Sequence, residues 1–278
     1  MKMNASIVLY DNDKELVIKA IHSFLNTKLY VKLYLIDNSA TDILRCLSDI
    51  SDRIEYIFNA KNLGFGTAHN ISLQTSIDDN VPYHLVLNPD VYYEHGVVEE
   101  LINYMDSNTD IANVMPKIYY PDGDVQHLCK MLPTPFELIV RRFSPISRVI
   151  ECMNKIFELH KSGYDKCMNI PYLSGCFMLL RTDSLKQVGL FDENIFLYME
   201  DLDLNRRLHI QYRTMFYPHV SVVHVHAKES YKRTDYLWMH IKSTIYYFNK
   251  WGWFLDKSRK KINNDLHSHL KGLTDDCP

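Results

Sequence analysis

Short apolar runs alternate with amphipathic segments in the first part of the chain, and this alternation constrains the fold more than any other feature. Apolar runs of strand type cover residues 5–10, 31–36, 54–58 and 83–87. The segment Glu15–Leu25, between the first two runs, carries apolar residues at helical spacing. Strand–helix–strand order is typical of a parallel sheet covered by helices, whose ligands bind beyond the carboxyl ends of the strands. The sequence therefore predicts an α/β fold with a mainly parallel central sheet flanked by helices.

Two aspartates follow predicted strands directly. Asp37 ends the second strand, and Asp90 follows the fourth within Asn88-Pro89-Asp90. Because Pro89 fixes φ and donates no N–H, it ends the strand and presents Asp90 on a rigid turn. A carboxylate there can hold a divalent cation that neutralises a diphosphate, since hard cations choose oxygen ligands. The alternative for both aspartates is an ordinary turn or N-cap residue.

A glycine-containing segment, NAKNLGFGTAHN, runs from Asn59 to Asn70, between the third strand and a helix. Gly64 and Gly66 flank Phe65. Glycines let the backbone approach a ligand closely, and a helix start offers free N–H groups to phosphate. The segment lacks the rest of a dinucleotide fingerprint or a P-loop. A tight strand-to-helix connection is therefore the alternative.

Residues 174–208 form the second concentration of chemistry. They begin with a buried strand, cross a short helical segment, break at Gly189 and reach the acidic residues Glu200, Asp201 and Asp203 at the start of a helix. Carboxylates at a helix start can cap free N–H groups and complement the helix dipole. They can equally serve as a general base. Spacing alone leaves both interpretations open.

The remaining segments are less specific. Residues 132–168 combine prolines, a basic pair and an amphipathic helix. This composition indicates a lid, an insertion or a contact surface. The alternative is a helix packed on the sheet. His224 and His226 lie on one face of a predicted strand and are either structural or ligating. Between residues 228 and 261 there are nine Lys or Arg and three Asp or Glu, interleaved with Trp and Tyr. That pattern suits an anionic membrane surface or a solvated basic tail.

Composition excludes several classes. The formal net charge of −3 argues against a nucleic-acid-binding protein. The six cysteines are scattered without metal-binding spacing, which indicates reduced thiols in a cytosolic protein. No signal peptide and no apolar run long enough to span a membrane is recognisable. We therefore expect a cytoplasmic protein, peripheral on the inner face of the cell membrane if its basic region binds there.

The motifs IDNSATD, NLGFGTAHN, LNPDV, SGCFMLLR, VGLFDENIFLYMEDLDLNRRL and VVHVHAKES, in this order and spacing, resemble family 2 inverting glycosyltransferases of the GT-A fold. The similarity is greatest to the bacterial rhamnosyltransferase-like branch that builds O-antigen and capsule glycans, and it covers about residues 5–250. It implies a GT-A catalytic domain at 1–227 and a basic, aromatic helical extension at 228–278. Within the domain, 1–120 would bind the nucleotide-sugar, 132–168 would be a variable insertion or lid, and 170–227 would form the acceptor and catalytic half.

The resemblance also implies roles for individual residues. Asp37 matches the aspartate that binds the pyrimidine ring of the donor, and Asp90 matches a ligand of Mn²⁺ or Mg²⁺ in the DxD motif. The first acid of that motif is Asn88 here, which removes one charge and leaves metal dependence open. His224 matches a histidine that completes the metal site. The donor-binding set implied by the resemblance is Tyr10, Asp37, Asn62, Gly64, Asn70, Asn88 and Asp90.

Asp201 matches the general base of the family, with Glu200 beside it. The QxxRW motif of processive synthases is absent, so we expect an inverting, non-processive transferase that adds one or a few sugars to a glycan or lipid-linked glycan acceptor. The first expectation for the donor is dTDP-rhamnose, with UDP-galactose, UDP-glucose and UDP-galactofuranose open. A nucleotidyltransferase is disfavoured because YDNDKE replaces its Gly-rich, Arg-containing loop. A non-catalytic nucleotide-sugar-binding or scaffold protein is the alternative of a different class.

Overall fold

Strand β1 (Lys2–Leu9) is buried on both faces, as its unbroken apolar run predicts, and it lies inside the sheet between two parallel neighbours. The structure is a computed structural model that describes residues 2–143, 146–225 and 234–274. Helix α1 (Lys14–Leu25) follows β1. Its N-cap, Asp13, accepts hydrogen bonds from the backbone N–H groups of Glu15 and Leu16, so the DND turn both ends the strand and starts the helix.

The other elements follow in an α/β order. The first half continues with β2 (Tyr30–Asp37), η1 (Ile43–Ile50), β3 (Ile54–Phe58), α2 (Phe65–Asp78), β4 (Tyr83–Leu87), β5 (Val91–Tyr92), α3 (Val97–Ser107) and β6 (Ile111–Tyr119). The second half contains β7 (Cys129–Lys130), α4 (Pro135–Phe143), α5 (Ser147–Phe157), η2 (His160–Ser162), β8 (Met168–Asn169), β9 (Tyr172–Leu173), β10 (Phe177–Arg181), α6 (Thr182–Val188), α7 (Glu200–Gln211), β11 (Arg213–His224), α8 (Thr234–Trp251) and α9 (Lys257–Thr274).

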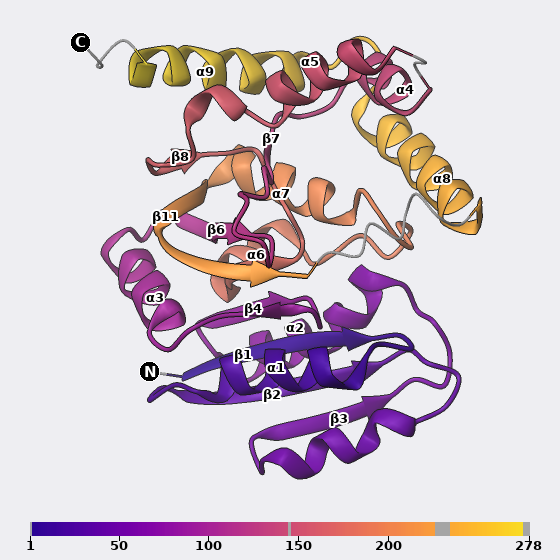
Figure 1. Ribbon diagram of the computed structural model, residues 1–278, viewed down its shortest axis with the longest axis vertical. Helices are drawn as coiled ribbons and strands as arrows, with labels where there is room; N and C mark the ends of the chain where they lie inside the picture. The colour runs from indigo at the N-terminus through magenta and orange to yellow at the C-terminus, as the bar shows by residue number, and fades with distance from the viewer. Residues whose placement is uncertain (1, 144–145, 226–233, 275–278) are drawn as a thin grey trace.

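The main sheet has the strand order β3-β2-β1-β4-β10-β6-β11-β5, with β8 also paired to β11. The strands from β3 to β4 run parallel, β10 is antiparallel to both of its neighbours, and β6 and β11 are again parallel. The predicted α/β fold with a mainly parallel sheet is confirmed. Figure 1 shows the first strands at one end of the molecule and α4, α5 and α9 together at the other end.

The second half differs from the sequence expectation in two places. The sequence pattern at 214–217 and 220–223 predicts two short strands, but these residues form one bulged strand, β11, whose register with β6 shifts between Tyr217 and Ser221. The segment after the Gly123 turn makes only a single bridge, Val125 to Tyr119, before Cys129 and Lys130 pair with β9 in a separate two-stranded sheet. His226 lies outside the described residues, so its predicted position beside His224 is not described.

A polar network lies inside the core, beneath α2. The Ser6 hydroxyl is 2.7 Å from Nδ1 of His69 and 2.8 Å from Nε2 of His84, and Nδ1 of His84 is 2.7 Å from the Ser76 hydroxyl. Both histidines are fully buried. Burial lowers the pKa of His84 to about 3, and burial together with the neighbouring His84 lowers the pKa of His69. The network therefore requires neutral imidazoles.

Acid should destabilise the fold through these histidines. A group whose folded pKa is depressed favours the unfolded state once the pH falls below its unfolded pKa, about 6.5. For His84, with a folded pKa of about 3, moving from about pH 7.5 to about pH 5 should lower the free energy of unfolding by about 2 kcal/mol. Urea denaturation at the two pH values measures this loss.

The control variants separate His84 from other titrating groups. His84→Gln should remove most of its share of the pH dependence, whereas His22→Gln, on the exposed side of α1, should change nothing. An equal pH dependence in the wild type and in His84→Gln would contradict the assignment.

Candidate active site

The short strand β5 brings Asp90 to His224. Val91 of β5 pairs with His224 at the end of β11, and the backbone N–H of Val225 donates to the carbonyl of Asp90 at 3.1 Å. As a result, Oδ1 of Asp90 lies 3.4 Å from Nε2 of His224. Residues 134 positions apart in the chain thus meet at the carboxyl ends of β4 and β11, where a ligand of this sheet is expected.

Gln126 fixes the orientation of the His224 ring. The Gln126 amide donates to the carbonyl of His224 at 2.7 Å, and its Oε1 lies 2.9 Å from Nδ1 of His224. Nδ1 therefore carries a proton toward Gln126, and Nε2 faces Asp90. Burial lowers the pKa of His224, but the Cys176 sulfur and the Asp90 carboxylate outweigh it and raise the pKa to about 10.

This pair fits an open site for a divalent cation. Adjacent ligands at metal distances of about 2.0–2.2 Å lie roughly 3 Å apart, close to the observed spacing of Asp90 and His224. A histidine ligand whose other ring nitrogen is held by a side chain has the outer-shell support typical of metal sites. Within the described residues no three His, Cys, Asp or Glu side chains gather as a closed metal site.

Asp201 lies at the start of α7 and accepts two backbone hydrogen bonds. Its Oδ2 accepts from the N–H of Gly175 at 3.0 Å, and its Oδ1 accepts from the N–H of Leu202 at 2.8 Å. Burial raises its pKa, while Lys130 and these N–H groups act in the opposite direction. The N-cap of α7 is Met199, which makes no side-chain capping bond. Asp201 is thus held at its carboxylate and reaches beyond its own helix.

Glu200, next to Asp201, has a different environment. Its side chain is buried, and its Oε2 has no hydrogen-bond partner among the described residues. Burial and the neighbouring Asp201 carboxylate raise its pKa well above the ordinary value. When two adjacent carboxylates differ in the number of hydrogen bonds that they accept, their pKa values move apart. We therefore assign the negative charge of the pair to Asp201 and the proton to Glu200.

One short segment, residues 174–176, connects the acidic pair to the Asp90 turn. Its Gly175 N–H holds Asp201, and the carbonyl of the next residue, Cys176, accepts from the backbone N–H of Asn88 at 2.9 Å. A Cβ on Gly175 would lie 3.1 Å from the Cβ of Asp201, so a larger residue would press against the carboxylate. The structure therefore brings Asn88, Asp90 and His224 to one side of this segment and Asp201 to the other.

The predicted donor residues at the first strands form a separate group. Asp37 is fully buried, and it accepts hydrogen bonds from the Ser39 N–H and the Tyr56 hydroxyl. Asn38 links this end of β2 to the next segment, because its amide donates to the Gly64 carbonyl at 3.1 Å and contacts Asn62. Tyr10, at the end of β1, is exposed. This group meets the requirement that donor residues lie at neighbouring strand ends.

Gly64, Gly66 and Asn70 contact the loop that precedes α7. A Cβ on Gly64 would lie 2.3 Å from the carbonyl oxygen of Phe196, and one on Gly66 would lie 2.7 Å from the Cβ of Phe191. The Asn70 amide donates to the Phe191 carbonyl at 2.9 Å and accepts from the Phe191 N–H at 3.0 Å. The close approach that these glycines allow is therefore made by the loop at residues 189–199.

Comparison with known proteins decides the family. The model described as Glycosyl transferase family 2 matches residues 6–189. The chain belongs to glycosyl transferase family 2. Two similar characterised proteins are an N-acetylglucosaminyl-diphospho-decaprenol L-rhamnosyltransferase of Mycobacterium tuberculosis and Rhamnosyltransferase WbbL of Escherichia coli. The first is 28% identical over 267 residues, covering 88% of this chain and 85% of the relative. The second is 24% identical over 273 residues, covering 94% and 98%. The predicted resemblance to rhamnosyltransferases of this family is confirmed, and the protein is a glycosyltransferase.

Solved structures support the fold. A crystal structure of GalNAc-T7 with UDP, GalNAc and Mn²⁺ superposes with a TM-score of 0.60 at 13% identity, covering 81% of this chain and 43% of that one. Staphylococcus aureus TarS gives 0.57 at 14% identity, covering 83% and 38%. The glycosyltransferase thus spans less than half of either solved chain. At such identities the likeness shows the fold alone, and it confirms the expected GT-A type.

Sequence reasoning missed several residues of this glycosyltransferase's site. Gln126 lies outside the quoted motifs, and Asn38 lies within IDNSATD without a role that the sequence indicated. Lys130 lies on β7 with its Nζ 4.9 Å from the ring centroid of Tyr172, and β9 is tied to α7 through the Leu173 carbonyl, which accepts from Asn205 at 2.9 Å. Only the pairing of β7 with β9 brings Lys130 toward Asp201. No local sequence signal marks that pairing.

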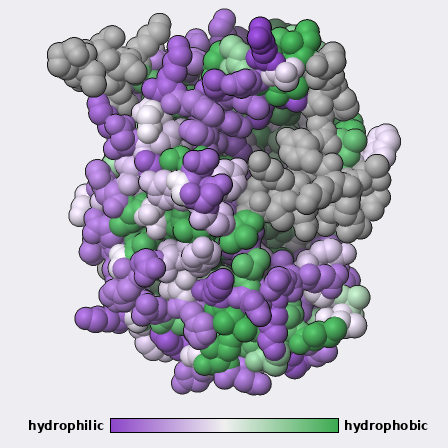
Figure 2. Space-filling view, in the orientation of Figure 1, coloured by the Kyte–Doolittle hydropathy of each residue, from purple (hydrophilic) through white to green (hydrophobic). Residues whose placement is uncertain are grey.

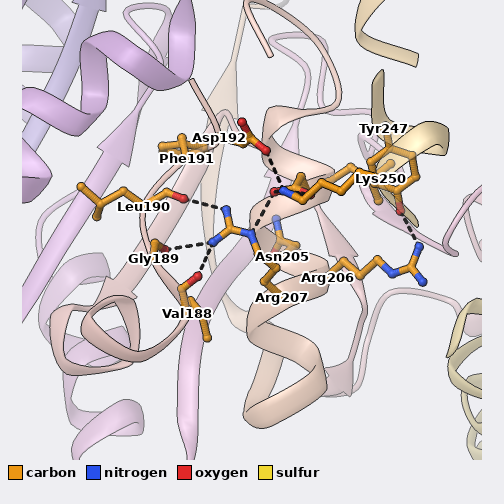
Figure 3. A network of polar contacts seen from close by, with 12 residues as sticks. Val188, Gly189, Leu190, Phe191, Asp192, Asn205, Arg206, Arg207, Tyr247 and Lys250 are labelled. Carbon is orange, nitrogen blue, oxygen red and sulfur yellow. Dashed lines mark hydrogen bonds and ion pairs between the residues drawn. The ribbon is translucent and has the colours of Figure 1, made fainter. Parts of the chain in front are cut away.

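A buried carboxylate, Asp203, anchors α7 to its surroundings. Its oxygens accept from Nε of Arg207 at 2.9 Å, from Nζ of Lys250 at 3.0 Å and from the Trp251 indole at 2.7 Å. Lys250 also donates to Asp192 at 2.7 Å, which ties the loop before α7 to α8. Figure 3 shows the Arg207 guanidinium facing the carbonyls of residues 188–190, the start of that loop. The third acid of the cluster at 200–203 is therefore structural.

Removing the Asp203 charge should be costly. Asp203→Asn leaves Arg207 and Lys250 without their common buried partner, and breaking a buried pair in this way typically costs about 3–5 kcal/mol. Urea denaturation at neutral pH measures the loss. The matched control is Asp183→Asn, since Asp183 pairs with Lys186 on the surface, where a pair contributes about 0–1 kcal/mol. Equal effects of the two variants would contradict the anchoring role.

Proposed function

We propose that the protein is an inverting, non-processive glycosyltransferase that moves rhamnose from dTDP-rhamnose to a lipid-linked glycan in bacterial surface polysaccharide synthesis. The observation that carries the chemistry is Asp201, an anionic carboxylate held by two N–H groups and joined through residues 174–176 to the Asp90–His224 pair. The names of the Mycobacterium tuberculosis and Escherichia coli relatives support the sugar, and the diphospho-decaprenol in the first name supports the acceptor.

The donor occupies the strand ends. The nucleoside lies against Tyr10, Asp37 and the 62–70 segment, and the diphosphate lies toward Asp90 and His224. Asp90 and His224 would hold Mn²⁺ or Mg²⁺, which would supply positive charge to the diphosphate and so improve the leaving group. Asn88 contributes its amide in place of a second carboxylate. The order of the groups along the sheet edge supports this placement.

Asp201 activates the acceptor. Its carboxylate takes the proton of the acceptor hydroxyl while the oxygen attacks the anomeric carbon from the face opposite the diphosphate. The bond from that carbon to the diphosphate oxygen breaks as the new glycosidic bond forms, which inverts the configuration. General-base help of this kind is typically worth about 10²–10⁴ in rate. Glu200 stays protonated beside it and keeps the pair from carrying two charges.

The acceptor side lies toward Lys130 and the 132–168 segment. Lys130 lowers the pKa of Asp201, against the larger effect of burial, and offers a cation to an acceptor that carries phosphate. Within the described part of the chain, no helix combines the length and the apolar character that a bilayer crossing needs. As part of the proposal, a lipid-linked acceptor would be met at the inner surface of the cell membrane. The division into a catalytic domain at 1–227 and an extension at 228–278 is part of the same proposal.

Two isosteric variants test the assignment of the base. Asp201→Asn should lower kcat by about 10²–10⁴ and leave donor binding unchanged, because the amide cannot take the proton. Glu200→Gln should cost less than about tenfold, since an amide mimics the protonated carboxyl that we assign to Glu200. The assay is release of nucleoside diphosphate from a panel of dTDP-rhamnose, UDP-galactose, UDP-glucose and UDP-galactofuranose with a lipid-linked acceptor. If Glu200→Gln lost activity and Asp201→Asn kept it, the two residues would have the opposite roles. If the enzyme turned over a UDP-sugar and not dTDP-rhamnose, that UDP-sugar would be the donor.

The metal role is tested by binding. Asp90→Ala should weaken nucleoside diphosphate affinity in Mn²⁺ or Mg²⁺ and have little effect in EDTA, because the carboxylate acts through the cation. Isothermal titration calorimetry under both conditions makes the comparison. Asp124→Ala, on the exposed turn after β6, serves as the control. Equal affinity for wild type and Asp90→Ala with and without metal would remove Asp90 from the metal site.

A further inference from the structure

Apolar side chains point outward at the end of the molecule that carries α4, α5 and the α8–α9 joint. In the joint, Phe254 is 84% exposed and Leu255 is 95% exposed. Along the two helices the exposed members are Phe136, Ile139, Ile146, Val149 and Ile156. We call these seven residues the docking face. Scattered surface apolar residues need no explanation, but a gathered set of this size marks an interaction site.

Helix α5 exposes its apolar stripe instead of burying it. Ile146, Val149 and Ile156 follow the three- and four-residue spacing of one helix face, and all three are exposed, whereas Phe157 on another face is buried. Arg148 is exposed within the same segment. A helix that packs only on its own protein would turn the stripe inward. The stripe on α5 is therefore available for a partner outside the described chain.

In the α8–α9 joint, residues 254–261, the acidic side chain is buried and the lysines are exposed. Asp256 is buried, accepts from Arg206 at 2.7 Å and from the backbone N–H of Arg259 at 2.9 Å, and Arg259 is itself buried. The residues that remain exposed are Phe254, Leu255, Ser258 and the three lysines Lys257, Lys260 and Lys261. Every exposed charge between residues 254 and 261 is thus positive, although the whole chain carries a formal charge of −3.

The joint and α4 belong to one surface. The Asn263 amide and the backbone of Leu132 exchange hydrogen bonds at 2.9 and 3.0 Å, and Arg259 donates to the Pro133 carbonyl. Leu138 of α4 packs in the same cluster as Trp251 and Trp253. Figure 1 shows α4, α5 and the start of α9 at one end of the molecule, and Figure 2 shows hydrophobic side chains reaching the surface there.

We propose that the docking face and its lysines bind an anionic phospholipid bilayer, with Phe254 and Leu255 entering the acyl boundary. The argument is charge complementarity at the joint: its exposed apolar side chains are flanked by lysines and its acid, Asp256, is turned inward, which matches an apolar layer beneath negative headgroups. On α5 the exposed Glu151 is paired with Lys155. The membrane-binding proposal rests on the proposed function, because a lipid-linked acceptor would lie in the bilayer that this face binds. It places the membrane contact on α4, α5 and the joint, rather than on the whole basic extension that the sequence indicated.

Vesicle flotation tests the proposal without any need for catalysis. The full chain at low salt should float with vesicles of phosphatidylcholine containing about 30% phosphatidylglycerol and stay behind with phosphatidylcholine alone. Phe254→Ser with Leu255→Ser should reduce the bound fraction at least about tenfold. Lys257→Glu, Lys260→Glu and Lys261→Glu together should reduce it more, since each lysine contributes about fivefold at such a surface. Both variants alter exposed side chains, so circular dichroism should show the fold intact.

Matched controls lie at the other end of the molecule. Tyr30→Ser with Ile43→Ser removes two comparably exposed apolar side chains, and Lys14→Glu, Lys19→Glu and Lys28→Glu make the same charge change on exposed lysines near α1. Each control variant should lose less of its vesicle-bound fraction than its counterpart on the docking face. The apolar control should keep the bound fraction of the wild type. Absence of binding at low salt, equal binding to neutral vesicles or equal losses in the controls would overturn the proposal. Concentration-dependent dimerisation lost in Phe254→Ser/Leu255→Ser, without vesicle binding, would assign the face to a second copy instead.

If the vesicle results hold and no nucleotide-sugar is turned over, the membrane face stands and the proposed function fails. If transfer to a water-soluble acceptor is normal in Phe254→Ser/Leu255→Ser while flotation is lost, the face serves membrane contact and not the chemistry. The two hypotheses therefore fail separately.

Discussion

The buried carboxylate of Asp203 is the interaction on which the catalytic arrangement depends. It gathers Arg207, Lys250 and Trp251 around the first turn of α7, and through Lys250 and Arg207 it also holds the loop at residues 188–192. The residues just before α7, Tyr198 and Met199, have positive φ angles that side chains other than glycine seldom adopt. Such a backbone persists only when its surroundings fix it. The ion-pair network around Asp203 supplies that constraint. By fixing the first turn of α7, it also fixes the orientation of the Asp201 side chain.

The two halves of the site are joined by backbone as well as by charge. Residues 174–176 give one N–H to Asp201 and one carbonyl to the turn before Asp90, so the proposed base and the proposed cation site are joined by one short segment. The β5–β11 pairing then sets His224 against Asp90, and Gln126 sets the ring. Short elements of two residues thus do as much for the geometry as the long strands, because each fixes one functional group relative to another.

The sequence predicted most of the sheet for physical reasons, and the roles that it gives to the acidic residues stay predictions. Strands β1 and β4 are buried and mainly apolar, with Ser6 and His84 as polar exceptions that bond to each other, and Pro89 marks the turn that carries Asp90. It did not predict β5 or the β7–β9 pair, since two residues show no period. It could not rank Glu200 against Asp201 either, because the difference lies in N–H donors from a distant segment. The glycines at 64 and 66 gave a correct signal of close approach, but the approaching group is the loop at residues 189–199.

The contact of Asn70 with Phe191 has a consequence for how the two substrates communicate. One amide side chain holds the N–H and the carbonyl of a residue in the loop that leads to the base, while its helix begins at the donor segment. If a bound donor orders the 59–70 segment, the hydrogen bonds of Asn70 to Phe191 would order the loop at residues 189–199 as well. By linkage, a donor that favours the ordered loop raises the affinity for the acceptor, and the acceptor raises the affinity for the donor by the same factor. Asn70 is therefore the side chain through which such coupling between the two proposed substrates would pass.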